Sequence, residues 1–199
     1  MYPIAGRQTL AVVGEGCHED LRRAAGEKQR MNFLAISGSA RRASTNTALL
    51  RALAEVASPG DTVEVCAGIG DLPVFSPDLE DDRTPPAVAA FVERIRPEYV
   101  RSIPGGLKNA IDWLVSGDAI VGKPVALLHA SHRGDDMLEA LRTVLATVTA
   151  RFEPDVFARF DLMAKSPEQV RDALRDPDGA ARLSAFLSAF KRAISRSAG

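Results

Sequence analysis

The residues of this chain best suited to chemistry lie together in one short polar segment, residues 36–47. It reads Ile-Ser-Gly-Ser-Ala-Arg-Arg-Ala-Ser-Thr-Asn-Thr and combines hydroxyls, an amide and guanidinium groups around a single glycine. An apolar run, Phe33 to Ile36, precedes the polar residues, and an amphipathic helix is predicted after them. A turn from a strand into a helix binds anions, because free N–H groups and the positive end of the helix dipole converge there. The segment therefore suggests a site for a phosphate-bearing cofactor.

The individual residues of this turn admit two interpretations. Arg41 can supply charge-assisted donors to a phosphate, and Ser39, Ser44 and Asn46 can supply neutral ones. Alternatively, Ser44 or Asn46 is an ordinary N-cap of the following helix, since both residue types favour that position. Taken alone, the turn supports the cap and the phosphate site equally.

A second segment, residues 97–113, is typical of a proline-punctuated loop that leads into a helix. Glu98, Tyr99 and Ser102 bring a carboxylate, a phenol and a hydroxyl together before this helix. The bland alternative is a loop in which the tyrosine packs and the glutamate is solvated. Trp113 is predicted to belong to the core, because it shares a helix face with neighbouring apolar residues.

A third segment, residues 129–134, again leads from a strand through small residues into a helix, and it reads His-Ala-Ser-His-Arg-Gly. His129 and His132 raise the question of a metal or acid–base site. No carboxylate or third ligand stands at a fitting spacing, so we expect histidines without a catalytic role and no metal site.

Length and composition limit the remaining choices. With 199 residues, 46% of them hydrophobic and 26% charged, the chain fits one well-buried globular domain. A net charge of −1 argues against nucleic acid or an anionic membrane as partner. Two cysteines are too few for a disulfide framework, and no apolar run approaches the roughly 20 residues of a membrane span. Without a signal-peptide pattern, the expected compartment is the cytoplasm.

The elements that must position these segments alternate between strand and helix. Strands are predicted over residues 32–37, 62–66, 124–131 and 152–157, and the first and third of them are the strongest. Helical periodicity is predicted over residues 49–56, 87–96, 103–115 and 135–149, and the tail carries two further helices. This rhythm predicts an α/β fold with a doubly wound parallel sheet covered by helices on both faces. All three polar segments then fall at the carboxyl ends of strands, where such sheets bind ligands.

Taken together, the three segments resemble the NADPH-dependent FMN reductase family, which has a flavodoxin-like fold and includes quinone, chromate and azo-dye reductases. The family's first motif, Gly-Ser-x-Arg-x-x-Ser-x-Asn, is matched by Gly38, Ser39, Arg41, Ser44 and Asn46. Its second motif is matched from Pro97 through Trp113, except that Val100 replaces the usual asparagine. Ala130, Ser131 and Gly134 match the third.

The resemblance implies a function and a set of binding residues. A chain of this family passes hydride from NADPH or NADH through FMN to a quinone, flavin, chromate or azo acceptor by a ping-pong mechanism. The protein supplies position and polarity and needs no nucleophile or base of its own, so no catalytic side chain is expected. A homodimer or homotetramer is also implied. The implied ligands of the FMN phosphate are Ser39, Arg41, Ser44 and Asn46, with Thr47 beside them. The isoalloxazine ring and ribityl chain would be contacted by Pro97, Glu98, Tyr99 and Ser102. The third side of the site would be lined by Ser131.

The chain departs from the family at two places. Residues 1–30 precede the family's usual start, so the chain divides into an extension, residues 1–30, and a flavodoxin-like domain, residues 31–199. The extension is a disordered arm or an upstream-start artefact, unless its run from Thr9 to Gly14 forms an extra strand. The family also places a buried strand directly before Pro97, whereas here the preceding helix continues to Arg96.

The charged residues before Pro97 do not suit a central strand that is covered on both faces. Three explanations stay open: an adapted fold, replacement of that strand by the run Thr9 to Val13, or a damaged copy. The functional alternatives are therefore a non-catalytic or vestigial flavodoxin-like protein that has lost flavin turnover, and an anion-binding module that uses the first turn alone.

Overall fold

The computed structural model describes residues 9–16, 31–39, 43–76, 79, 83–94, 105–115, 120 and 122–196. Its strands are β1 (Thr9–Gly16), β2 (Met31–Ser37), β3 (Thr62–Cys66), β4 (Val125–His129) and β5 (Phe152–Arg159). Its helices are α1 (Thr45–Glu55), the short 3-10 helix η1 (Ile69–Asp71), α2 (Pro86–Arg94), α3 (Gly105–Val115), α4 (Asp135–Val148), α5 (Pro167–Arg175) and α6 (Pro177–Arg196). These bounds agree closely with the predicted strands and helices, and β3 has the predicted limits.

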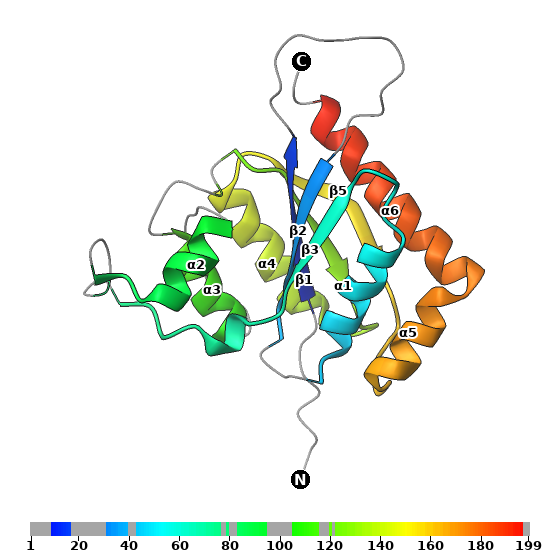
Figure 1. Ribbon diagram of the computed structural model, residues 1–199, viewed down its shortest axis with the longest axis horizontal. Coiled ribbons are helices and arrows are strands. Elements are labelled where there is room, and N and C mark those ends of the chain that lie inside the picture. The colour runs from blue at the N-terminus through cyan, green and yellow to red at the C-terminus, as the bar shows by residue number, and fades with distance from the viewer. Residues whose placement is uncertain are drawn as a thin grey trace.

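The five strands form one sheet in the order β3-β2-β1-β4-β5 (Figure 1). β2 and β3 are parallel, and so are β4 and β5, whereas β1 is antiparallel to both of its neighbours. Apart from this central strand, the order is that of a flavodoxin-like sheet. The predicted doubly wound α/β fold is therefore confirmed, with one antiparallel strand at its centre.

β1 occupies the sheet position beside β2. The predicted absence of a strand before Pro97 lies outside the described residues, because 95–104 are not among them. The run Leu10 to Val13 is entirely apolar, which suits a strand with neighbours on both sides. The sequence left open whether the run from Thr9 forms an extra strand, and the structure contains this strand. The division of the chain at residue 31 stays a prediction.

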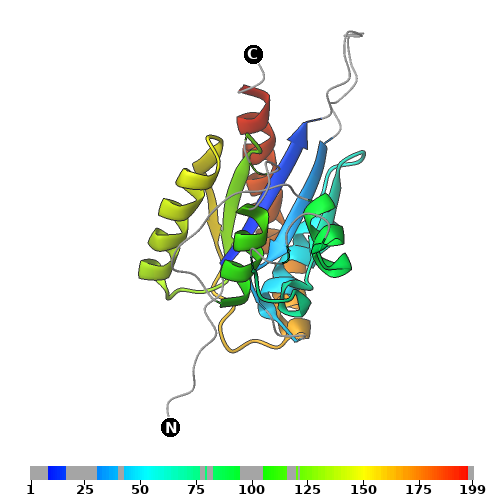
Figure 2. The same cartoon turned by 90° about the vertical axis from the view of Figure 1, so that its left-hand side faces the viewer.

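Helices cover both faces of the sheet and give three layers (Figure 2). On β2, Phe33 and Ala35 pack into a cluster with α1, α5 and α6. Leu34 and Ile36 belong to a second cluster with α2, α3 and α4. This alternation follows from the two-residue period of a strand. β4 is also covered on both faces, and it is apolar from Val125 to Leu128. Among the described residues, no helix is long and apolar enough to cross a membrane.

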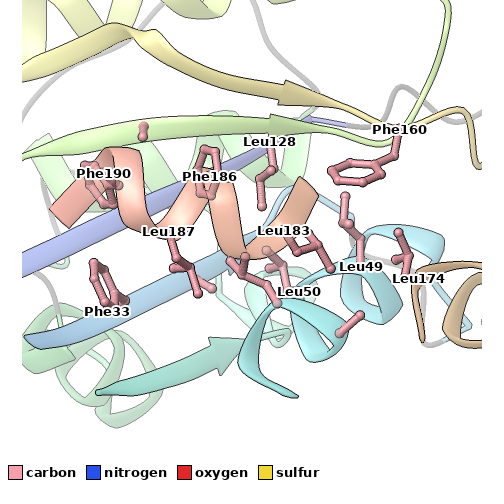
Figure 3. Close-up of a cluster of buried hydrophobic side chains, with 14 of the residues drawn as sticks. Phe33, Leu49, Leu50, Leu128, Phe160, Leu174, Leu183, Phe186, Leu187 and Phe190 are labelled. Carbon is pink, nitrogen blue, oxygen red and sulfur yellow. The ribbon is translucent and has the colours of Figure 1, made fainter. Parts of the chain in front are cut away.

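The packing of α1 fixes the start of this helix at the end of β2. Leu49 and Leu50 are fully buried and face side chains of α6 such as Leu183 and Leu187 (Figure 3). At the other end of the helix, Glu55 accepts two hydrogen bonds from Arg175 of α5, at 2.9 and 3.1 Å. The first turn of α1, which holds the predicted phosphate ligands, is thus anchored by the core.

Candidate cofactor site

The candidate site lies at the edge of the sheet where β2 and β4 end. Because β1 is antiparallel to both, its first residues reach the same edge: Leu10 lies opposite Ser37, and Thr9 lies opposite His129. The loop after β2 leads into α1, and the turn after β4 leads into α4. The topology therefore brings the first and third polar segments to one place.

The start of α1 is capped in the usual way. Ser44 has an extended backbone (φ −109°, ψ 126°), and its hydroxyl accepts a hydrogen bond from the Thr47 backbone N–H at 3.4 Å. The hydroxyls of Thr47 and Ser37 lie 3.0 Å apart and share a hydrogen bond, which ties the helix to the last residue of β2. The cap interpretation of Ser44 is thus confirmed, and the cap uses only one of the free N–H groups of the first turn.

Asn46 is the unusual residue of this turn. Its side chain is 0% exposed, yet neither the nitrogen nor the oxygen of its amide has a hydrogen-bond partner within the described structure. Burying an unsatisfied amide costs about 1–3 kcal/mol, and such groups are rare in native proteins. The backbone N–H groups of the first helical turn, those of Thr45 and Asn46 among them, have no acceptor within the helix itself. These unused donors at a helix start fit an anionic group such as a phosphate.

The other helix at this edge is less suited to an anion. α1 has no acidic residue in its first turn, whereas α4 begins with Asp135 and Asp136. Asp135 accepts a hydrogen bond from the Arg159 guanidinium, and this bond holds the pKa of its carboxyl below the ordinary value. The positive end of the α4 dipole therefore already faces carboxylates, so electrostatics favour α1 as the place for a phosphate.

The turn after β4 is closed by hydrogen bonds of its own. Ser131 is buried, and its oxygen accepts from the Arg133 backbone N–H at 3.0 Å, which leaves the hydroxyl proton free for another acceptor. The ring Nε2–H of His129, which is fully buried, donates to the Arg133 carbonyl at 2.8 Å. Gly134 has φ +93°, a left-handed conformation that favours glycine, and it begins α4. These hydrogen bonds hold Ser131 in place at the edge of the sheet.

The second histidine of this turn, His132, contacts a surface carboxylate. His132 is half exposed, and its Nδ1 lies 2.8 Å from a carboxylate oxygen of Asp161. In the part of the chain that the structure describes, no group of three or more histidine, cysteine, aspartate or glutamate side chains could hold a metal ion. Both histidines thus have structural partners.

The helix of the second motif, α3, is hydrogen-bonded to the loop after β3. We call this contact of Asn109 and Trp113 with Pro73 and Phe75 the clamp, and the sequence did not predict it. The Asn109 amide donates to the Pro73 carbonyl at 2.9 Å and accepts from the Phe75 N–H at 2.8 Å. The Trp113 indole N–H donates to the same Pro73 carbonyl at 2.7 Å, and its ring meets Phe75 edge to face at 5.1 Å. Trp113 is buried, as predicted, and Val74 between the clamped residues is 82% exposed. The spacing of four between Asn109 and Trp113 was the available signal, since it puts both on one helix face.

The predicted binding residues divide into two sets. Those that the structure brings to the edge of the sheet are Ser39, Ser44, Asn46, Thr47 and Ser131. Those that lie outside the described residues are Arg41, Pro97, Glu98, Tyr99 and Ser102. Ser37, which was not predicted, joins the first set through its bond to Thr47.

Comparisons with known proteins find relatives that are reductases by name. A quinone reductase of Escherichia coli is 35% identical over 115 residues, which cover 52% of this chain and 61% of that protein. An NAD(P)H-dependent FMN reductase of Pseudomonas aeruginosa is 40% identical over 112 residues, 51% of this chain and 60% of that protein. A probable NADPH:quinone oxidoreductase of rice, Oryza sativa subsp. japonica, is 47% identical over 96 residues, 42% of this chain and 47% of that protein.

The matched regions thus span at most about three-fifths of these relatives' own lengths. Residues 31–159 match the family model of the NADPH-dependent FMN reductases, so the match begins at β2 and ends with β5. This interval contains both loops that meet at the edge of the sheet and the clamp formed by α3. The chain belongs to the NADPH-dependent FMN reductase family.

Proposed function

We propose that this protein is an FMN-dependent NAD(P)H oxidoreductase that reduces a small acceptor such as a quinone. The observation that carries the proposal is the buried, unpartnered amide of Asn46 at the start of α1. A phosphate at this place would accept hydrogen bonds from the amide and from the Thr45 and Asn46 N–H groups. The names of the relatives, which include quinone reductases and an FMN reductase, support the same reading.

The residues at the edge have distinct tasks in this proposal. Asn46, Ser39 and Arg41 hold the FMN phosphate, and Ser44 adds its hydroxyl proton while its oxygen caps the helix. Ser131 lines the site from the side of β4, and the residues from Pro97 to Ser102 edge the flavin ring. Bound FMN supplies the hydride chemistry, from NAD(P)H to the acceptor in a ping-pong sequence. The chain itself orients the cofactor and shields it from water.

Arg41→Ala provides the test of the phosphate site. Loss of a charge-assisted hydrogen bond is worth about 1.5–3 kcal/mol, so FMN affinity should fall by roughly 10- to 150-fold. Affinity for riboflavin, which lacks the phosphate, should not change. Arg51→Ala is the matched control, because Arg51 is exposed later on α1 and lies outside the first turn. Titration of flavin fluorescence gives the FMN and riboflavin affinities of the wild type, Arg41→Ala and Arg51→Ala.

Turnover is tested with the wild-type protein and FMN. NADPH and NADH oxidation should depend on added FMN and on a quinone, chromate or azo acceptor, with the parallel double-reciprocal plots of a ping-pong mechanism. Flavin binding without turnover would favour the non-catalytic alternative instead. Phosphate binding without any flavin affinity would favour an anion-binding module. Either result would refute the oxidoreductase proposal.

The proposal also includes a homodimer or homotetramer in the cytoplasm. Val74, an apolar residue of the loop after β3 that is 82% exposed, is a convenient position at which to probe a subunit contact. Light scattering coupled to size exclusion should give a mass of two or four chains. Val74→Asp should lower that mass, and a monomeric wild-type protein would contradict this part of the proposal.

A further inference from the structure

β1 connects two halves of the sheet that otherwise share no backbone pairing in the described structure. In the described structure, β2 pairs with β3 and β4 pairs with β5, and only β1 bridges the two pairs (Figures 1 and 2). β2 and β4 are largely buried by helices on both faces. Without β1, each would present a row of unpaired backbone groups inside the protein, which is costly. The gap between them is therefore a site shaped for one extended strand.

The two ends of β1 meet different parts of the molecule. At the cofactor edge, Thr9 pairs with His129 of β4 and Leu10 pairs with Ser37 of β2. These partners are the last residues of the strands from which the first and third loops emerge. At the opposite edge, Glu15 and Gly16 pair with β2 alone. The first residues of β1 thus fix the spacing of the two strand ends that carry the cofactor loops.

We propose that residues 9–16 act as an inserted strand that holds the two cofactor loops at their working distance, so that flavin affinity depends on the N-terminal segment of the same chain. The choice of FMN as ligand rests on the function proposed above. The apolar run Leu10 to Val13 fits the gap, because a central strand buried on both faces needs continuous apolar residues. The strand is a positioning element and does not touch the reacting atoms.

Cross-linking tests whether the strand occupies the gap, and in which register. Val12 lies opposite Ala35, and opposed residues of antiparallel strands have Cα atoms about 4.5–5.5 Å apart, within disulfide range. In a background of Cys17→Ser and Cys66→Ala, the pair Val12→Cys and Ala35→Cys should oxidise within one chain. Val12→Cys with Phe33→Cys is the control, since Phe33 pairs with Gly14 and the distance is too long. A link in the control pair alone, no link, or a link only between chains would overturn the proposal.

Hydrogen exchange in the wild-type protein tests the coupling to the cofactor edge. The amides of Leu10 to Val13 should exchange slowly, and saturating FMN should slow them further by about tenfold or more. The amides of Glu15 and Gly16 should change much less, because their end of the strand is remote from the loops. Rapid exchange of Leu10 to Val13 without flavin, or an equal response along the whole strand, would refute the proposal.

Proline variants of the full-length protein measure the effect on affinity. Leu10→Pro removes pairing at the cofactor edge and should weaken FMN binding by about tenfold or more, while Glu15→Pro should weaken it by less than about threefold. Equal affinities of the two variants would overturn the proposal. If Leu10→Pro does not fold, the wild-type exchange experiment decides. A wild-type protein without FMN affinity would refute the proposed function, whereas the cross-link would still report on strand insertion.

Discussion

Replacing Asn46 by leucine should stabilise the protein without flavin and weaken its binding of FMN. The Asn46 amide is 0% exposed and unpartnered in the described structure, so the folded protein bears the cost of a desolvated polar group. Leucine branches at the same carbon and has a similar length without the polar atoms. The free energy of unfolding should therefore rise by about 1–3 kcal/mol, the cost of an unsatisfied buried group. For a chain of this size each kcal/mol raises Tm by about 2–4 °C.

The same change should act in the opposite direction on the cofactor. A hydrogen bond to a charged phosphate is worth about 1.5–3 kcal/mol, so FMN affinity should fall by roughly 10- to 150-fold. Riboflavin affinity should stay the same, because the ring and ribityl chain do not need this amide. Urea unfolding without flavin gives the stability, and quenching of flavin fluorescence gives the two affinities.

Asn109→Leu is the matched control for this experiment. The Asn109 amide also lies on a helix, but both its nitrogen and its oxygen are hydrogen-bonded to the loop after β3. Its replacement should lower the free energy of unfolding, the opposite sign to Asn46→Leu. The reasoning would be refuted if Asn46→Leu destabilised the flavin-free protein and left FMN affinity unchanged, because the amide would then have a structural task and no ligand.

Two further predictions concern the clamp and the surface. Trp113→Phe removes the indole N–H from the Pro73 carbonyl and leaves a cavity, so the free energy of unfolding should fall by about 1–3 kcal/mol, and unchanged urea unfolding would contradict the clamp. Hydrogen bonding from Arg175 lowers the pKa of the Glu55 carboxyl below its ordinary value of 4.5. The pair therefore stabilises the fold above pH 4.5. This stabilisation is lost as the pH falls through the lower pKa of the folded state. The stability gap between wild type and Glu55→Gln should therefore be small at pH 7, since the pair is exposed, and should close as the pH falls through the folded-state pKa of Glu55. A gap that widens on acidification would refute this assignment.

Local pattern was sufficient to predict most of the elements and their ends. β3 has its predicted limits because the half-buried Val63 and Val65 alternate with exposed polar residues between two turns. α4 begins at the predicted Asp135, directly after Gly134 with its left-handed backbone. Such boundaries depend on a few adjacent residues, which is why the sequence is sufficient for them.

Pairing partners were harder to predict for a physical reason. The apolar run Leu10 to Val13 predicts a covered strand, but such a run does not specify the neighbours or the direction of the strand. Its place between β2 and β4 depends on the unpaired edges of these two strands, which are known only once the sheet is assembled. Likewise, Asn109 and Trp113 stood on one helix face, but the carbonyl they bind belongs to Pro73, far away in the sequence. The sequence identifies Asn46 as a possible phosphate ligand. That its amide is buried without a hydrogen-bond partner depends on the packing around it, which the sequence does not reveal.

Ser44 shows how the cap and the phosphate site can be separated experimentally, although the sequence left them as equal alternatives. Its oxygen accepts from the Thr47 N–H, so its proton remains available to a ligand. Replacing an N-cap serine by alanine costs about 1 kcal/mol, while glycine costs only a few tenths. Ser44→Gly should therefore unfold almost like the wild type and Ser44→Ala should be less stable by about 1 kcal/mol.

FMN affinity should follow a different order in these two variants. Both lack the hydroxyl, so both should bind FMN more weakly by a similar factor and bind riboflavin unchanged. If affinity instead followed stability, with Ser44→Gly binding FMN as tightly as the wild type, the serine would be a cap alone. The phosphate would then depend on Asn46 and the free N–H groups of the first turn of α1, which Ser44 only holds in place.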